Sequence, residues 1–132
     1  MSGHVIQPAG WPRPSGYANG VAASGRVVMV AGQVGWDPVT ERFAAADMAG
    51  QSAQALRNVA AVLDAGGAKP ENVVRLTWYV IDREAHVAAR PEVGAAYRAI
   101  FGRHFPAMSV VVVKGLLEDG ALVEIEATAV VP

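Results

Sequence analysis

Residues 121–131 read ALVEIEATAVV, a stretch in which apolar and polar side chains alternate. This alternation is typical of a β-strand whose two faces meet different surroundings. Val123, Ile125 and Ala127 share one face, and Glu124 and Glu126 share the other. The two glutamates are about 6.5–7 Å apart along such a strand. We therefore predict a strand with one buried face and two neighbouring carboxylates on its other face.

Other strands are predicted on both sides of the centre of the chain. Their residue ranges are 18–23, 26–32, 73–81 and 108–113. Ser24-Gly25 supplies a turn between the first two strands. Residues 4–16 contain three prolines, which indicates an extended lead-in, and Asp37-Pro38 indicates a loop over residues 36–43.

Two helices are predicted between these strands. Asp47 is a suitable N-cap for the first, and Gly66-Gly67 ends it. Its apolar residues recur every three to four positions: Ala49, Ala53, Leu56, Val59, Ala60 and Leu63. The second helix starts near Pro91 and must end before Pro106.

The order of elements is β-β-α-β-α-β-β, which predicts an α+β fold. Each helix connects two strands, so both helices should cover one face of a mixed sheet. The other face also looks largely apolar, and a partner subunit is the simplest cover for it.

Composition limits the classes of protein to which this chain can belong. The 132 residues, 52% of them hydrophobic, suit a single domain over residues 1–132. Net charge is -1 with no basic run, so nucleic-acid binding is not expected. The absence of cysteine excludes disulfides and thiol nucleophiles. With no leader and no apolar span, we expect a cytoplasmic protein without a membrane partner.

The glutamate pair has two interpretations. Carboxylates among apolar residues can act as general acid or base. Alternatively, Glu124 and Glu126 belong to a solvated strand face or pair with Arg75. The three histidines, His4, His86 and His104, have no metal-ligand spacing, so no metal site is expected.

Several segments, in order and with similar spacing, resemble one known family. They are Gly16-Tyr17 with Gly20-Val21, residues 30–34 (VAGQV), Asp37-Pro38, the helical pattern within residues 54–66, residues 105–109 (FPAMS) and residues 121–127 (ALVEIEA). Together they cover nearly the whole chain. On these motifs the chain is identified as a member of the RidA/YjgF superfamily, also called endoribonuclease L-PSP.

The resemblance implies a chorismate-mutase-like α+β fold and a homotrimer with small-molecule pockets between subunits. It further implies a hydrolase or deaminase that acts on enamines or imines without a cofactor. Glu124 would place or activate water. The other expected pocket residues are Tyr17, Ala31, Gly32, Met108 and Ser109.

The chain departs from the family pattern at three of its positions. Met108 stands where active members carry an arginine that clamps the substrate carboxylate, and methionine cannot donate a charge-assisted hydrogen bond. Ala31 replaces a usual serine, and Gly94 replaces a frequent asparagine. The pocket should therefore be more apolar. Arg103, Arg13 and Arg75 are the candidates for a replacement anion contact.

Three functions follow, in order of preference. The first is a Rid-like hydrolase of a small enamine, imine or related nitrogenous metabolite. The second is a non-catalytic trimeric protein that binds a small molecule. RNA cleavage or inhibition of translation comes third, because the charge balance opposes it.

Overall fold

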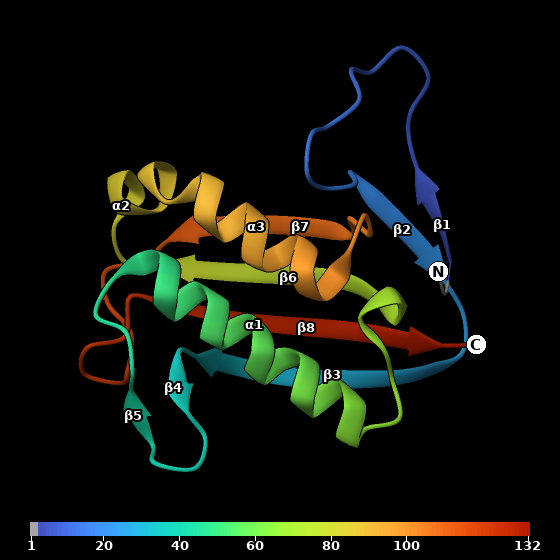
Figure 1. Cartoon of the computed structure of the whole chain (residues 1–132). Helices are drawn as coiled ribbons and strands as arrows, with labels where there is room; N and C mark the ends of the chain where they lie inside the picture. The colour runs from blue at the N-terminus through green and yellow to red at the C-terminus, as the bar shows by residue number, and fades with distance from the viewer. Residues whose placement is uncertain (1–2) are drawn as a thin grey trace.

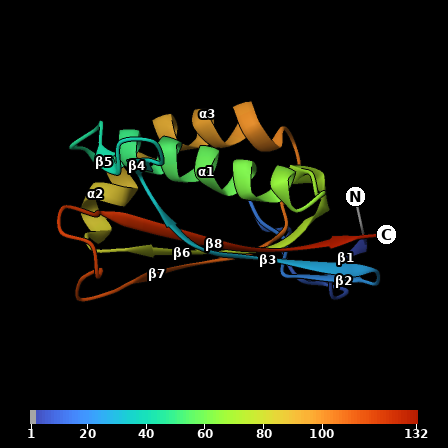
Figure 2. The same cartoon turned by 90° about the horizontal axis from the view of Figure 1, so that it is seen from below.

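The computed structural model describes residues 3–132. Its centre is a four-stranded sheet in the order β3-β8-β6-β7. These strands are β3 (Arg26–Val34), β8 (Val123–Val131), β6 (Val73–Val80) and β7 (Ala107–Val112). Helices α1 (Met48–Ala65) and α3 (Arg90–Phe101) lie across one face of this sheet (Figures 1 and 2). The predicted α+β class, with a mixed sheet and two helices on one face, is confirmed.

Chain connectivity explains why both long helices lie on the same side. Strands β3 and β6 each run antiparallel to β8, which lies between them, so they are parallel to each other. Strands β6 and β7 pair in parallel directly. Parallel neighbours need a crossover, and a right-handed crossover places each helix on the same face. Thus α1 links β3 to β6, and α3 links β6 to β7.

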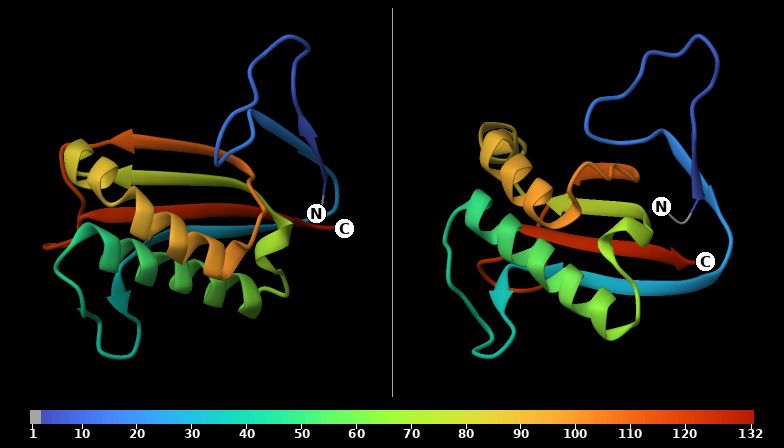
Figure 3. Two further views of the ribbon diagram at one scale, coloured as in Figure 1. Left: turned by 45° about the horizontal axis from the view of Figure 1, so that its top comes forward. Right: turned by 45° about the vertical axis from the view of Figure 1, so that its right-hand side comes forward.

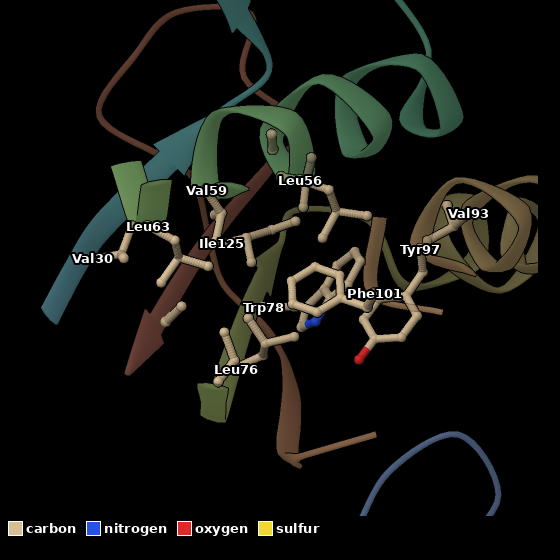
Figure 4. Close-up of a cluster of buried hydrophobic side chains, with 14 of the residues drawn as sticks. Val30, Leu56, Val59, Leu63, Leu76, Trp78, Val93, Tyr97, Phe101 and Ile125 are labelled. Atoms are coloured by element: carbon tan, nitrogen blue, oxygen red, sulfur yellow. The ribbon is translucent and has the colours of Figure 1, made fainter. Parts of the chain in front are cut away.

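The hydrophobic core lies between the two helices and the sheet (Figure 4). On α1, Leu56, Val59 and Leu63 are fully buried, as the apolar stripe predicts. Leu76 and Ile125 face them from β6 and β8. Asp47 caps α1 by accepting a hydrogen bond from the Gly50 amide at 2.9 Å, which confirms the predicted start. None of the helices within residues 3–132 is long and apolar enough to span a membrane.

The N-terminal segment differs from the prediction. The extended lead-in contains a strand, β1 (Gly3–Ile6), which pairs with β2 (Gly20–Ala23). This hairpin stands away from the helical layer at one end of the sheet (Figure 3). Gly25, with a φ of 145°, takes the chain from β2 into β3, and these two strands do not pair with each other. Strand β1 pairs with a segment about 17 residues away in the sequence. The periodicity of a short stretch of sequence gives no information about such a partner.

Three smaller elements occupy segments predicted as connections. The loop over residues 36–43 contains the two-residue strands β4 (Trp36–Asp37) and β5 (Arg42–Phe43). A short helix, α2 (Arg83–Ala88), precedes α3, with Asp82 as its N-cap. Six residues are too few to show an apolar stripe, so the sequence pattern did not reveal α2.

The sheet face opposite the helices, here called the open face, is not largely apolar, and that prediction was wrong. Its two central strands, β6 and β8, carry polar side chains there: Arg75, Thr77, Tyr79, Glu124, Glu126 and Thr128. Its outer strands carry exposed apolar ones, including Val27, Met29 and Val111. The open face therefore has a polar middle and apolar borders.

Candidate functional site

The two glutamates of β8 lie on the open face in different environments. Glu126 accepts a hydrogen bond from the Tyr79 hydroxyl at 2.5 Å. This bond raises the pKa of Tyr79, because the neighbouring carboxylate opposes loss of the phenolic proton. Glu124 makes no hydrogen bond or ion pair with any residue from 3 to 132, and the alternative pairing with Arg75 does not form there either. Glu124 is thus the free carboxylate of the pair.

A β-bulge in β3 sets the position of Glu124. Val30 pairs with Ala127, but Gln33 pairs with Ile125, so β3 contains one extra residue at this point. A Cβ atom built on Gly32 would overlap the Glu124 carboxylate, and glycine therefore lets the carboxylate lie against the bulged backbone. Bulges are frequent next to active sites, where they redirect groups.

Two other predicted residues, Ala31 and Ser109, lie on the outer strands of the sheet, β3 and β7. Ala31 precedes Gly32 in the bulge; its side chain is exposed, and its carbonyl accepts a hydrogen bond from Gln33 Nε2 at 3.1 Å. Ser109 is exposed on β7, in register with Thr77 of β6. Both side chains are therefore accessible from outside the protomer.

Met108 lines a cavity of about 600 Å³, here called the α3 cavity. This cavity lies between α3 and the β6–β7 edge of the sheet. Its lining consists of Ser15, Gly16, Trp78, His86, Arg90, Val93, Gly94, Tyr97, Arg98, Phe105, Met108 and Val110. Met108 pairs with Leu76, so its side chain lies on the helix side of β7, opposite to that of Ser109. This volume is in the range of cavities that hold small ligands.

The α3 cavity combines apolar walls with a few polar groups. Among residues 3–132, the charged residues that line it are Arg90 and Arg98, and both are cationic. Trp78 is 3% exposed, and its Nε1–H has no hydrogen-bond partner among the described residues. His86 Nδ1 is likewise buried without a partner in that part of the chain. Burial and the nearby Arg90 lower the pKa of His86, which favours the neutral imidazole.

Tyr17 lines a second cavity of about 280 Å³. Arg13, Arg103 and Phe105 also line it, and Phe105 is shared with the α3 cavity. Tyr17 is 42% exposed, so its ring closes no interior space within the protomer. The two cavities are thus neighbours that share one aromatic wall.

The structure brings some of the predicted residues together and separates others. Glu124 and Gly32 are in contact. Met108 is two strands and three residues of register away from Glu124, which places their Cα atoms about 14 Å apart. Their side chains also point to opposite faces of the sheet. One protomer therefore does not unite Met108 with Glu124 in a single pocket.

The structure also shows which arginines accompany Met108. The three candidates named from the sequence do not line the α3 cavity: Arg13 and Arg103 line the Tyr17 cavity, and Arg75 lies on the open face. Arg90 and Arg98 do line it, and sequence reasoning missed both. Arg90 and Arg98 are each four residues from Gly94 in the sequence. This spacing indicates that the three residues share one side of a helix, and it could have identified the two arginines.

A family model described as endoribonuclease L-PSP matches residues 12–131. The chain belongs to the endoribonuclease L-PSP family, also known as RidA/YjgF. This RidA/YjgF member is 36% identical over 125 residues to the RutC family protein PH0854 of Pyrococcus horikoshii, covering 95% of each chain. It is 38% identical over 117 residues to the 2-iminobutanoate/2-iminopropanoate deaminase of Escherichia coli, covering 86% of each.

Solved structures of the family share the fold. The Rid-family protein YyfB of Yersinia pestis, described as of unknown function, superposes with a TM-score of 0.84 at 35% identity, covering 99% of this chain and 100% of that one. The YjgF protein of Escherichia coli gives a TM-score of 0.68 at 35% identity, covering 96% of this chain and 98% of that one. The resemblance inferred from the motifs is thereby confirmed.

Proposed function

We propose that this RidA/YjgF member is a hydrolase, of the deaminase type, that acts on a small enamine, imine or related nitrogenous metabolite. The observation that carries the proposal is the free Glu124 carboxylate held against Gly32. Glu126 lacks this freedom, because Tyr79 donates to it. Relatives named as 2-imino acid deaminases make this reaction type the natural assignment.

We further propose that the active form is a homotrimer with a pocket at each subunit boundary. The separation of Met108 from Glu124 within one protomer supports this, because a second copy can bring the two surfaces together. The exposed apolar side chains of Val27 and Met29 on the outer strand β3 also need cover. In such a pocket the Tyr17 ring, the Ala31-Gly32 backbone and Ser109 would surround the ligand, with Met108 against its apolar part.

In the proposed reaction, Glu124 first accepts one proton and later donates the same proton. Water adds to the carbon of a protonated C=N bond while the Glu124 carboxylate takes a proton from that water. The resulting neutral carbinolamine then receives this proton on its nitrogen. The C–N bond breaks with its electron pair going to nitrogen, and the hydroxyl oxygen forms the C=O bond. The hydroxyl proton leaves with the departing ammonia, so the protonated imine and water yield a carbonyl compound and ammonium.

This scheme needs only one titratable residue. A positioned general base increases the rate of such a reaction by about 10²–10⁴-fold. We therefore expect no cofactor and no metal. The cytoplasmic location also stays a prediction.

The test is ammonia release from freshly generated imines and enamines. We expect Glu124→Gln to lower turnover by about 10²-fold or more, because the amide cannot accept a proton. Glu126→Gln is the matched control on the same strand face and should retain most activity. Unchanged turnover in Glu124→Gln would reject the assigned role.

A non-catalytic trimeric binding protein is the second candidate. One observation favours it: within residues 3–132 the α3 cavity is lined by Met108 and by no acidic side chain, so a ligand seated wholly within it would meet no carboxylate base. A co-purified ligand that is never converted, together with no ammonia release from any substrate of the panel, would establish this function.

A further inference from the structure

Three residues of α3 form a strip that faces the α3 cavity. Arg90, Gly94 and Arg98 are spaced by four, so they lie on one side of the helix, and all three line the cavity. Because the central residue has no side chain, the helix surface between the two arginines has a gap at Gly94. We call this strip the α3 notch.

The Arg98 side chain lies over the gap. A Cβ atom built on Gly94 would be 3.1 Å from Arg98 Nη1 and 3.9 Å from Arg98 Cζ. The guanidinium therefore occupies space that any other residue at position 94 would contest. Neither Arg98 nor Arg90 has a salt-bridge partner within residues 3–132. The donors of the notch are thus available for a ligand.

The rest of the cavity defines what kind of ligand fits. Phe105, Met108 and Val110 supply apolar walls, and no acidic side chain lines the cavity. The Trp78 Nε1–H, which is buried and has no hydrogen-bond partner within residues 3–132, adds a neutral donor deeper in the site. A small carboxylate with an apolar or aromatic body matches this combination, because a guanidinium pairs with a carboxylate through two parallel hydrogen bonds.

We propose that Arg98, seated in the gap left by Gly94, is the residue that selects an apolar organic anion for this pocket. It supplies the anion contact that Met108 cannot make. This inference rests on the proposed function, since it names a ligand contact of the same pocket. Arg98 is a specificity-determining residue here, and Glu124 keeps the chemical step.

Isothermal titration of the full-length protein with benzoate tests the proposal, with neutral benzamide as the comparison ligand. We expect benzoate to bind and benzamide to bind more weakly. Arg98→Gln should weaken benzoate binding about ten- to hundredfold, which corresponds to the loss of a hydrogen bond to a charged group. Arg57→Gln, on the outer side of α1, removes the same charge and should leave the affinity unchanged.

A second pair of variants tests the gap itself. Gly94→Leu fills the notch and displaces the guanidinium, so it should also weaken benzoate binding about tenfold or more, whereas Ala95→Leu on the exposed side of α3 should not. Leucine is a better helix former than glycine and only slightly poorer than alanine, so neither change should unfold the helix. No benzoate binding to the wild type, or equal binding by wild type and Arg98→Gln, would overturn the inference.

The experiments distinguish failure of the Arg98 anion contact from failure of the proposed hydrolase activity. Benzoate binding that depends on Arg98 in a protein that releases no ammonia would support the anion contact and reject the hydrolase. Ammonia release that is unaffected in Arg98→Gln, including from carboxylate-bearing imines, would support the hydrolase and reject the contact.

Discussion

Met108 shows how one side chain changes the properties of a conserved architecture. It lies on the helix side of β7 and contributes an apolar wall to the α3 cavity. The cationic groups of that cavity come instead from α3, at Arg90 and Arg98. The wall of the cavity that β7 supplies is therefore apolar, and its positive charge lies on the wall that α3 supplies.

The single residue His86 should make the stability of the protein depend on pH. Burial beside Trp78 and the charge of Arg90 lower its pKa below the ordinary value of 6.5, so the unfolded chain binds the proton more tightly. The stability contributed by neutral His86 is complete above 6.5 and is lost as the pH falls through its folded pKa. We expect the free energy of unfolding to fall more steeply between about pH 7 and 5 in the wild type than in His86→Asn. Chemical denaturation at several pH values measures this, and equal slopes would contradict it.

At the scale of elements, the side chain of Gln51 fixes the start of α1 against the segment that leads into β8. This side chain is 2% exposed. Its amide nitrogen donates to the carbonyls of Ala45 and Gly120, and its oxygen accepts from the Leu122 amide at 2.8 Å. Glu124 follows two residues later, so this contact helps to set where β8 begins and where its carboxylate lies.

Replacing Gln51 with leucine should therefore destabilise the fold. The volume is similar, but the Leu122 N–H and the two carbonyls, which are partly buried, lose their partner. A fully buried group left unpaired costs about 1–3 kcal/mol, so we expect a loss at the lower end of this range for each. Gln54→Leu is the control, because Gln54 bonds only to side chains of its own helix, Arg57 and Asn58. In urea denaturation, the midpoint should fall clearly for Gln51→Leu and change little for Gln54→Leu. Equal midpoints would contradict the assigned role.

For the whole molecule, the open face of the sheet is the surface on which the proposed assembly depends. Its polar middle contains Glu124, and its apolar border on β3 includes Met29, which is 70% exposed. This arrangement suits an interface with apolar contacts around a site that keeps polar groups. The proposed homotrimer would cover the border and leave the carboxylates facing a pocket.

Met29→Lys tests that assembly. A lysine there would place an unpaired charge in the buried border, which costs several kcal/mol and should dissociate the trimer. Val39→Lys, at a side chain that is 89% exposed in the β4–β5 hairpin, is the control and should stay assembled. Analytical ultracentrifugation at low micromolar concentration reads the mass directly. A wild-type monomer, or a Met29→Lys trimer, would contradict the interface.

The sequence by itself determined the elements whose pattern is local: the α1 stripe with its Asp47 cap, the alternating faces of β6 and β8, and the two crossovers. It also placed Glu124 and Glu126 on one face, since side chains alternate along a strand. Only the tertiary structure decided that β1 pairs with β2, that Gly32 receives the Glu124 carboxylate, and that Arg98 lies over Gly94. It also decided that Met108 and Glu124 lie apart in one protomer. These features depend on contacts between distant segments and on a bulge that shifts register, and neither produces a periodic signal in the chain.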